Sequence, residues 1–403
     1  MQTSLVDAIK KTPQGREAED ILRSCVHCGF CTATCPTYQV LGDELDGPRG
    51  RIYLIKQMLE GNAVTAKTQL HLDRCLHCLA CETACPSGVR YGRLVDIGRE
   101  MVEERVPRRL SANLLRSAMR RILPFPRRFG ALLGVGRRLR PLLPAAWRMK
   151  LPTERQAGAW PAARHARRML VLDGCVQPVT APGTNAAAAR VLDKLGISLI
   201  RAQDAGCCGA LSHHLSAHQE ALRFARRNID AWWPYLEAGV EAVVMTASGC
   251  GAMVREYGEL LRDDPAYAGK AARIAALTRD VSEVVAKENL EPLGIDAQGE
   301  RVAFQVPCTL QHAQRLNGSV EAILIRCGYQ PTPVADPHLC CGSAGTYSIT
   351  QPALSQRLLA DKLTALQAGE PAVIATANIG CQLHLQSRAA VPVRHWLELL
   401  DRP

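Results

Sequence analysis

The first quarter of the chain contains two copies of one cysteine pattern, fifty residues apart. Each copy has three cysteines at intervals of three and a fourth that is followed by proline. The copies are Cys25-x2-Cys28-x2-Cys31-x3-Cys35-Pro36 and Cys75-x2-Cys78-x2-Cys81-x3-Cys85-Pro86. This is the spacing of [4Fe-4S] ligands, in which the fourth thiolate of each copy binds the other cluster. The sequence therefore predicts two [4Fe-4S] clusters, one on Cys25, Cys28, Cys31 and Cys85, the other on Cys75, Cys78, Cys81 and Cys35.

Two other uses of cysteine agree less well with this pattern. A zinc site usually closes one tetrahedron with two CxxC pairs, whereas each copy here has a triple run and a Cys-Pro end. Disulfides need an oxidising compartment, and the start of the chain, Met1 to Lys11, has charges but no apolar stretch of signal-peptide length. We therefore expect a cytoplasmic protein whose 17 cysteines serve as metal ligands or redox groups.

A second cysteine pattern is repeated in the C-terminal half. Each copy has a single cysteine, then a Cys-Cys-Gly turn, then one more cysteine, with an offset of 133 residues between the copies at the first three positions. Because this spacing recurs, the thiols are candidate ligands of an additional iron–sulfur centre rather than core residues. Cys327 has no counterpart and is predicted to be a core residue. The eight candidates are Cys175, Cys207, Cys208 and Cys250, and Cys308, Cys340, Cys341 and Cys381.

Apolar runs precede the single cysteines of this second pattern and are candidates for buried strands. Helical stretches such as 186–195 and 354–366 separate them. Each copy is thus predicted to be a parallel α/β unit with its thiols at the carboxyl ends of strands, where open α/β sheets place their ligands. Gly209 and Gly342 suit a close backbone approach or a positive φ. The four runs are Met169 to Leu172, Ala242 to Met245, Val302 to Val306 and Ala372 to Ala375.

Helical signals surround the N-terminal cysteines. Residues 48–60 and 66–74 are predicted helices, the first capped by Asp46 and carrying Ile52, Ile55 and Leu59 on one face. A further helix follows the second cysteine string, with Leu94, Ile97 and Met101 on its apolar face. We therefore expect a mainly helical domain whose cysteine loops lie at helix ends, where unpaired N–H groups stabilise negative charge on the clusters.

A basic segment separates the two cysteine patterns. From Arg105 to Lys150 there are thirteen Lys or Arg and no Asp or Glu, and outside it acidic residues outnumber basic ones despite the net charge of +11. Its arginine pairs alternate with Leu, Phe and Trp147, a mixture that suits an anionic membrane surface. A solvated linker or a docking surface for an acidic partner subunit accounts for the charge equally well. Nucleic acid is not expected, because there is no binding motif and few aromatic residues, and no apolar stretch predicts a transmembrane helix.

The residues around the first cysteine string closely resemble the iron–sulfur subunit of glycolate oxidase (glycolate dehydrogenase). The resemblance rests on Cys25 to Tyr38, CVHCGFCTATCPTY, and on Gly42 to Leu54, GDELDGPRGRIYL. The Cys-Cys-Gly repeats resemble the cysteine-rich (CCG) domains of heterodisulfide reductase, anaerobic glycerol-3-phosphate dehydrogenase and lactate-utilisation subunits. One departure is that Ala247 and Asn378 stand where heterodisulfide reductase has a fifth thiol, so each half keeps four.

This resemblance implies an α plus α/β fold: a helical two-cluster ferredoxin domain over 1–105, a basic amphipathic linker over 106–165, and CCG α/β repeats over 166–290 and 300–403. It also implies an electron-transfer subunit of a flavin-dependent glycolate dehydrogenase, with no catalytic residue on this chain.

The same resemblance implies the partners. Gly134-x-Gly136 lacks the third glycine of a dinucleotide loop, so FAD and the oxidation of glycolate to glyoxylate are expected on partner subunits. Electrons are expected to pass to a quinone-type acceptor at the inner face of the cell membrane. The alternatives are a subunit of a related lactate or glycerol-3-phosphate dehydrogenase, or a thiol or heterodisulfide reductase-type subunit.

Overall fold

A computed structural model describes residues 1–142 and 156–402, which form two compact units. The first unit holds Met1–Leu115 together with two later segments, Gln311–Ala313 and His338–Lys362, and the second unit holds the remainder. The part of the predicted basic segment that includes Trp147 and Lys150 lies outside the described residues.

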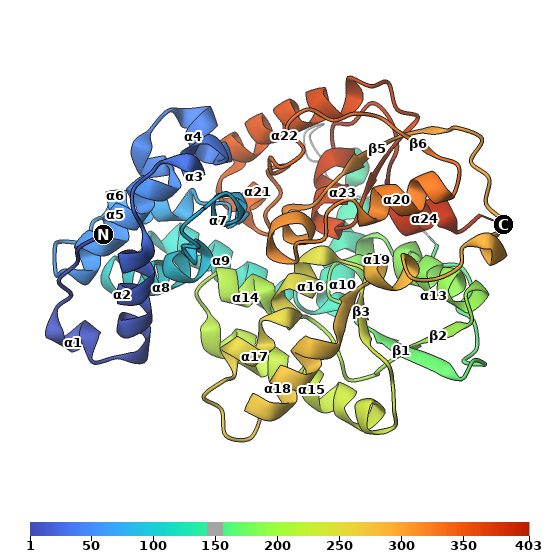
Figure 1. Ribbon diagram of the computed structural model, residues 1–403, viewed down its shortest axis with the longest axis horizontal. Helices are drawn as coiled ribbons and strands as arrows, with labels where there is room; N and C mark the ends of the chain where they lie inside the picture. Colours follow the sequence, from blue (N-terminus) through green and yellow to red (C-terminus); the bar gives the residue numbers. More distant parts are fainter. Residues whose placement is uncertain (143–155, 403) are drawn as a thin grey trace. The chain divides into compact units, whose positions relative to one another are not determined.

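The N-terminal part of the first unit is helical (Figure 1), which confirms the predicted class of its fold. The predicted helices over 48–60 and 66–74 correspond to α5 and α6. A short 3-10 helix, Glu44–Asp46, precedes α5. The helices are α1 (Asp7–Lys10), α2 (Pro13–Ser24), α3 (Phe30–Ala33), α4 (Pro36–Leu41), α5 (Pro48–Leu59), α6 (Ala66–Asp73), α7 (Ala80–Thr83) and α8 (Tyr91–Arg105).

Local chemistry explains where several of these helices begin. The hydroxyl of Thr12 accepts a hydrogen bond from the Gly15 N–H at 2.9 Å, and Pro13 occupies the first turn of α2. The prediction that Asp46 caps α5 is wrong: Gly47 is the N-cap, and Asp46 is fully buried. Its carboxylate instead pairs with the buried Arg51 and with Arg74, because a charge removed from water needs a counter-ion.

The core of the first unit joins α5 to α8. Ile52, Ile55 and Leu59 of α5 pack in one cluster with Leu94 and Ile97 of α8, as the apolar spacing predicts. Fully burying such a side chain contributes roughly 1.5–3 kcal/mol. This packing fixes the two helices that flank the cysteine loops.

The second unit contains two four-stranded parallel sheets of the same topology, with strand orders β2-β1-β3-β4 and β6-β5-β7-β8. Equivalent strands have equivalent registers: Leu170 pairs with Val243 in the first sheet, and the corresponding Ala303 pairs with Ile374 in the second. The four predicted strands correspond to β1, β3, β5 and β7. The strands are β1 (Arg167–Val171), β2 (Ile197–Arg201), β3 (Val243–Met245), β4 (Thr278–Asp280), β5 (Arg301–Gln305), β6 (Gln330–Pro331), β7 (Val373–Thr376) and β8 (Val393–His395).

Helices cover both faces of the first sheet (Figure 1). Successive residues of β1 point to opposite faces, so Val171 packs with Leu192 of α13 (Gly183–Lys194) in one cluster. Leu170 packs with Trp232 of α15 (His218–Glu237) in another. The cluster on the α13 side also contains residues of β5 and β7, so the two repeats share one core.

Of the remaining helices of the second unit, α10 precedes β1 in the chain and the others lie between or after the strands. They are α10 (Pro126–Arg138), α12 (Gln177–Thr180), α14 (Ala210–His214), α16 (Ser248–Arg255), α17 (Tyr257–Leu260), α18 (Ala268–Leu277), α19 (Val281–Val285), α20 (Ser319–Arg326), α23 (Ile379–Gln386) and α24 (Trp396–Leu400). Helix α21 (Tyr347–Thr350) lies in the first unit. Two helices continue from the first unit into the second: α9 (Leu110–Ile122) and α22 (Pro352–Gln367). Within residues 1–142 and 156–402, no helix is both long and apolar enough to cross a bilayer.

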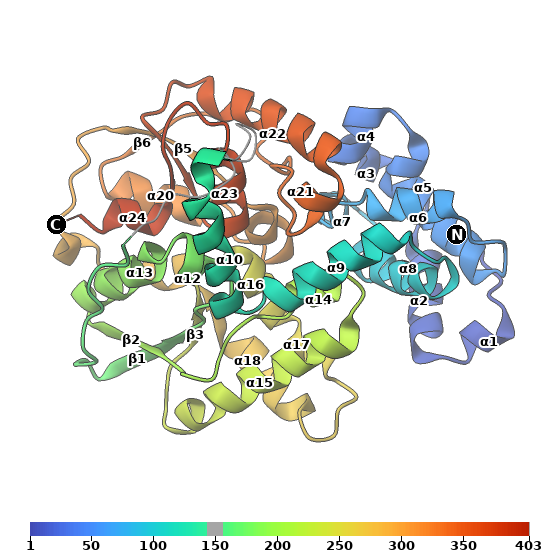
Figure 2. The ribbon, with the colours of Figure 1, turned by 180° about the vertical axis from the view of Figure 1, so that it is seen from behind.

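Part of the predicted basic linker forms α10, which lies beside α12 (Figure 2). Leu133 faces inward, whereas Leu132, Val135 and Leu139 are about half exposed. The spacing of these three side chains places them along one exposed stripe of the helix.

Candidate iron–sulfur centres

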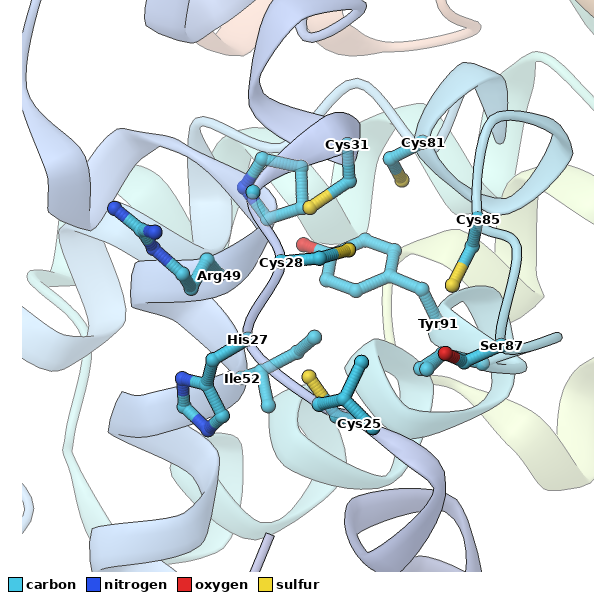
Figure 3. Close-up of a pocket in the computed structure, with 14 residues that line it drawn as sticks. Cys25, His27, Cys28, Cys31, Arg49, Ile52, Cys81, Cys85, Ser87 and Tyr91 are labelled. Carbon is cyan, nitrogen blue, oxygen red and sulfur yellow. The ribbon is translucent and has the colours of Figure 1, made fainter.

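The four thiols of the first predicted cluster surround one cavity (Figure 3). Cys25, Cys28, Cys31 and Cys85 all line it, and their sulfur atoms turn toward the same space. The cavity measures about 440 Å³ with its open mouth included. Burial raises the pKa of Cys31, and negative charge on the other three sulfurs would raise it further. The first cysteine loop and Cys85, fifty-four residues after Cys31, therefore meet at one site.

The four thiols of the second predicted cluster are gathered in the same way but lie deeper. Cys35, Cys75, Cys78 and Cys81 are all buried, whereas Cys28 of the first set is exposed. Burial raises the pKa of Cys81 well above its ordinary value, and charge on Cys78, Cys75 and Cys35 raises it further.

Both sets suit a cationic iron–sulfur group. Four ionised thiols held together in apolar surroundings repel one another, and bound iron supplies the positive charge that relieves this repulsion. The structure groups Cys85 with the first string and Cys35 with the second, which is the exchange of fourth cysteines that the spacing predicts. The ligand sets themselves stay a prediction.

The two cysteine loops share an unusual backbone turn. His27 and His77, which occupy equivalent positions, both have positive φ, 58° and 54°. The His77 N–H then donates a hydrogen bond to the sulfur of Cys75 at 3.4 Å. His27 is exposed, and its ring lies outside the group of sulfurs in Figure 3.

A charged network lies beside the second set. The guanidinium of Arg51, which is 1% exposed, lies 4.0 Å from the sulfur of Cys35 and donates to the hydroxyl of Thr37 and the carbonyl of His71. Asp46 faces Arg51 at 3.5 Å and also pairs with Arg74 at 2.7 Å and the His71 ring at 3.0 Å.

The same network acts on Cys75. Its sulfur accepts a hydrogen bond from the Tyr91 hydroxyl at 3.6 Å. Burial by itself would raise the pKa of Cys75, but the charges of Arg51 and Arg99 and the hydrogen bonds from Tyr91 and His77 lower it below its ordinary value.

Sequence reasoning missed Arg51 and Tyr91. A signal for Arg51 exists, because it precedes Ile55 by four residues and so lies on the apolar face of the predicted helix. An arginine at such a position needs a buried partner.

The four thiols of the first CCG repeat also meet, after the strands β1, β2 and β3. A hydrogen bond to Cys207 and burial both raise the pKa of Cys175 well above its ordinary value. Cys208 in turn contacts Cys207 and Cys250, and its own pKa is raised. The thiols thus form a chain from Cys175 through the vicinal pair to Cys250.

The vicinal pair is held by its backbone. The Cys208 carbonyl accepts from the Tyr257 hydroxyl at 2.8 Å, and the Cys207 carbonyl accepts from the Asn228 amide at 2.9 Å. Gly209 has a φ of 93°, and a Cβ on it would lie 3.0 Å from the Ala221 carbonyl oxygen. Both predicted reasons for glycine, positive φ and close approach, are therefore confirmed at this turn.

The second CCG repeat has the same turn. The Gly342 N–H lies 3.4 Å from the Cys340 sulfur, and the Gly209 N–H lies 3.4 Å from the Cys207 sulfur. Cys340 and Cys341 belong to the first unit, and Cys308 and Cys381 belong to the second. Asn378, which stands where related proteins have a thiol, donates to the Cys381 sulfur at 3.6 Å.

The segment His338–Lys362, which carries Cys340 and Cys341, contacts the second cysteine loop within the first unit. The Tyr347 hydroxyl donates to the carbonyl of Arg74, the residue before Cys75, at 3.1 Å. His312, from the other late segment of this unit, contacts the Thr83 hydroxyl at 3.1 Å.

Two further predictions concern single residues. Cys327 is 2% exposed and packs in the core shared by the two repeats, which confirms it as a core residue. Arg108, one of the basic-segment arginines, is not available to a membrane, because it pairs with Asp73 at 2.6 Å and Glu103 at 2.7 Å. The sequence pattern cannot distinguish such a paired arginine from an exposed one.

Comparisons with known proteins agree with this geometry. A 4Fe-4S dicluster domain matches residues 21–89, and a cysteine-rich domain matches twice, at 169–255 and 302–386. The chain is 57% identical over 403 residues to the glycolate oxidase iron-sulfur subunit of Escherichia coli (strain K12), covering 100% of this chain and 99% of that protein. It is 29% identical over 401 residues to the probable glycolate oxidase iron-sulfur subunit of Bacillus subtilis (strain 168), covering 92% and 90%. Lactate utilization protein A of Shouchella clausii (strain KSM-K16) is 23% identical over 234 residues, covering 56% and 95%.

Proposed function

Because this chain belongs to the family of glycolate oxidase iron–sulfur subunits, we propose that it relays electrons from FAD-containing partner subunits to a quinone-type acceptor at the inner face of the cell membrane. The partners would oxidise glycolate to glyoxylate. The observation that carries the relay role is the gathering of eight N-terminal thiols into two groups of four.

The proposed ligands are Cys25, Cys28, Cys31 and Cys85 for one [4Fe-4S] cluster and Cys75, Cys78, Cys81 and Cys35 for the other. Such a cluster takes up and releases one electron at a time, which suits a flavin that gives up its electron pair in two steps. The protein positions the thiols and limits water: Ile52 and Val89 line the first cavity, and the second set is buried.

Iron and acid-labile sulfide analysis of the purified chain, with EPR after reduction, tests this proposal. Eight irons and two reduced-cluster signals are expected from the N-terminal sets alone. Fewer than eight irons in fully folded protein would contradict the proposed ligand sets.

Glycolate is the proposed substrate of the complex because the 57% identity extends over the whole chain, whereas the lactate-utilisation relative matches 56% of it. Steady-state kinetics of the assembled complex with glycolate, lactate and glycerol 3-phosphate check this assignment. A higher kcat/KM for lactate or glycerol 3-phosphate would contradict it.

A second role is favoured by the thiol chain of the first CCG repeat. We propose that Cys175, Cys207, Cys208 and Cys250 hold an additional iron–sulfur centre, because all four meet at the carboxyl ends of the strands. More than eight irons per chain, reduced by Cys208→Ser, would support this. Eight irons with these thiols open to alkylation would favour the alternative of thiol chemistry.

Helix α10 is the proposed membrane-facing part of the basic segment. Leu132, Val135 and Leu139 are 55%, 50% and 46% exposed, and Arg127 and Arg138 are exposed beside them. Each such arginine contributes on the order of 1 kcal/mol near an anionic surface. The double variant Arg127→Gln/Arg138→Gln should therefore bind phosphatidylglycerol vesicles roughly tenfold or more weakly, while Lys67→Gln should bind as the parent does. Unchanged binding of the double variant would assign α10 to a subunit interface instead.

A further inference from the structure

The two proposed clusters have different electrostatic surroundings. Arg51 is a fully buried cation that lies 4.0 Å from the Cys35 sulfur, and the Tyr91 hydroxyl donates a hydrogen bond to the Cys75 sulfur at 3.6 Å. Cys35 and Cys75 are both proposed ligands of the second cluster. Arg51 therefore places a positive charge beside one of the four sulfurs of this site, and Tyr91 places a hydrogen bond on another.

The arginine beside the first site, Arg49, is more exposed to solvent than Arg51. Arg49 lines the first cavity, but its side chain is 39% exposed and pairs with Glu44 at 2.7 Å. Water and the carboxylate both weaken its effect on the sulfurs. Within the part of the chain that the structure describes, no other arginine or lysine lines this cavity.

Asp46 does not cancel the charge of Arg51. This carboxylate lies 3.5 Å from Arg51 but only 2.7 Å from Arg74, so it is shared between two guanidinium groups. Asp43 also lies within 4.8 Å of Asp46, but its exposure to water weakens its effect, so the buried positive charge of Arg51 remains beside the Cys35 sulfur. Neutral donors add to it, because the Tyr91 hydroxyl and the His77 N–H both point at the Cys75 sulfur.

Reduction adds one negative charge to a cluster. Nearby positive charge and hydrogen bonds to sulfur stabilise the reduced form and raise the reduction potential, whereas burial without such groups lowers it. The second set is the more buried of the two, so without Arg51 it would be the harder cluster to reduce. Burial lowers the reduction potential of the second cluster, and the positive charge of Arg51 raises it. We expect the charge to prevail, because it lies 4.0 Å from a ligand sulfur.

We propose that Arg51, supported by Tyr91, raises the reduction potential of the second cluster above that of the first. Arg51 therefore acts on the cluster through its positive charge and is not a catalytic residue. This inference rests on the proposed ligand sets. A higher potential at the second site would direct electrons toward the segment that carries Cys340 and Cys341, since Tyr347 of that segment contacts the second loop.

An EPR-monitored redox titration of the full chain tests this inference. Cys28→Ser and Cys78→Ser first assign the two signals, because each changes the ligands of one site. Arg51→Met should then lower the midpoint potential of the second cluster by an amount equal to at least a tenfold change in its reduction equilibrium, about 59 mV for a one-electron couple. Arg51→Lys, which keeps the charge, should recover most of the shift, and Arg49→Met is the matched control that should move neither potential by this amount.

The outcomes separate the inference from the proposed function. A parent protein with fewer than two reduced-cluster signals would contradict the ligand sets. If the parent gives two signals, and Arg51→Met moves neither midpoint or moves both equally, the ligand sets stand and the role of Arg51 is overturned. If Arg51→Met does not retain its iron, Tyr91→Phe decides instead, because it removes the hydroxyl that donates to Cys75 and keeps the ring that lines the first cavity. The second midpoint must then fall by more than the first, and an equal change or no fall would overturn the inference.

Discussion

The two cysteine loops have the same spacing and the same backbone turn, yet they lie in different surroundings. The first loop opens to solvent at Cys28, and the arginine that lines its cavity, Arg49, has a side chain that is 39% exposed. The three thiols Cys75, Cys78 and Cys81 of the second loop are buried, and a network that includes Arg51, Asp46 and Tyr91 lies beside them. Identical motifs therefore define where clusters bind, and the residues packed around them define how the clusters differ.

Removing one thiol from each loop should have the largest effect. Cys28→Ser and Cys78→Ser should each abolish electron transfer from glycolate to the external acceptor, because thiolates hold the clusters. Reduction of the partner's flavin by glycolate should survive in both variants. Stopped-flow absorbance of the flavin and a dye-reduction assay measure the two steps, and loss of flavin reduction would place the substrate chemistry on this chain.

The buried network of the second loop should matter next most. Asp46→Asn leaves the Arg51 charge buried with too little compensation, which costs about 3–5 kcal/mol in comparable sites. Urea unfolding of the variant measures this loss. Asp20→Asn, at an exposed position near the first loop, should change the free energy of unfolding by less than about 0.5 kcal/mol. Equal effects of the two substitutions would remove the energetic contrast between the loops.

Exposure should make the first cluster the easier one to strip of iron. With a chelator and a mild oxidant, iron should leave in two phases, the first from the site that contains the exposed Cys28. Absorbance of the iron–chelator complex follows the release, and EPR identifies the cluster that remains. Loss of the second signal before the first would contradict the difference in accessibility.

Replacing Arg49, on the same helix as Arg51, should have the smallest effect on the free energy of unfolding. Arg49→Gln breaks an ion pair whose side chains are 39% and 42% exposed, so the free energy of unfolding should fall by less than about 1 kcal/mol. Thermal unfolding followed by circular dichroism is sufficient to check this. A loss as large as that of Asp46→Asn would mean that the first loop also depends on a charged network.

The sequence predicted the features that depend on residues close in the chain. Cysteine spacing placed the thiols in two groups of four, and the apolar runs before Cys175 and Cys308 located β1 and β5. The position of Asp46 before Pro48 predicts a helix cap, but its partners Arg51 and Arg74 come close to it only when α5 and α6 pack together.

The features that the sequence could not predict depend on distant residues. Arg108 looked like every other arginine of its segment until Asp73 and Glu103 were placed beside it. No local pattern links Tyr347 to Arg74, so the presence of residues 338–362 in the first unit was also beyond sequence reasoning.

The hydrogen bond from Tyr347 to the Arg74 carbonyl has a consequence for biosynthesis. The two residues are 273 positions apart, so the ribosome must make most of the chain before the second cysteine loop can acquire its cover. Contacts between such distant residues form late, because a long loop must close first. The second loop therefore lacks this contact until Tyr347 has been made, long after its own cysteines.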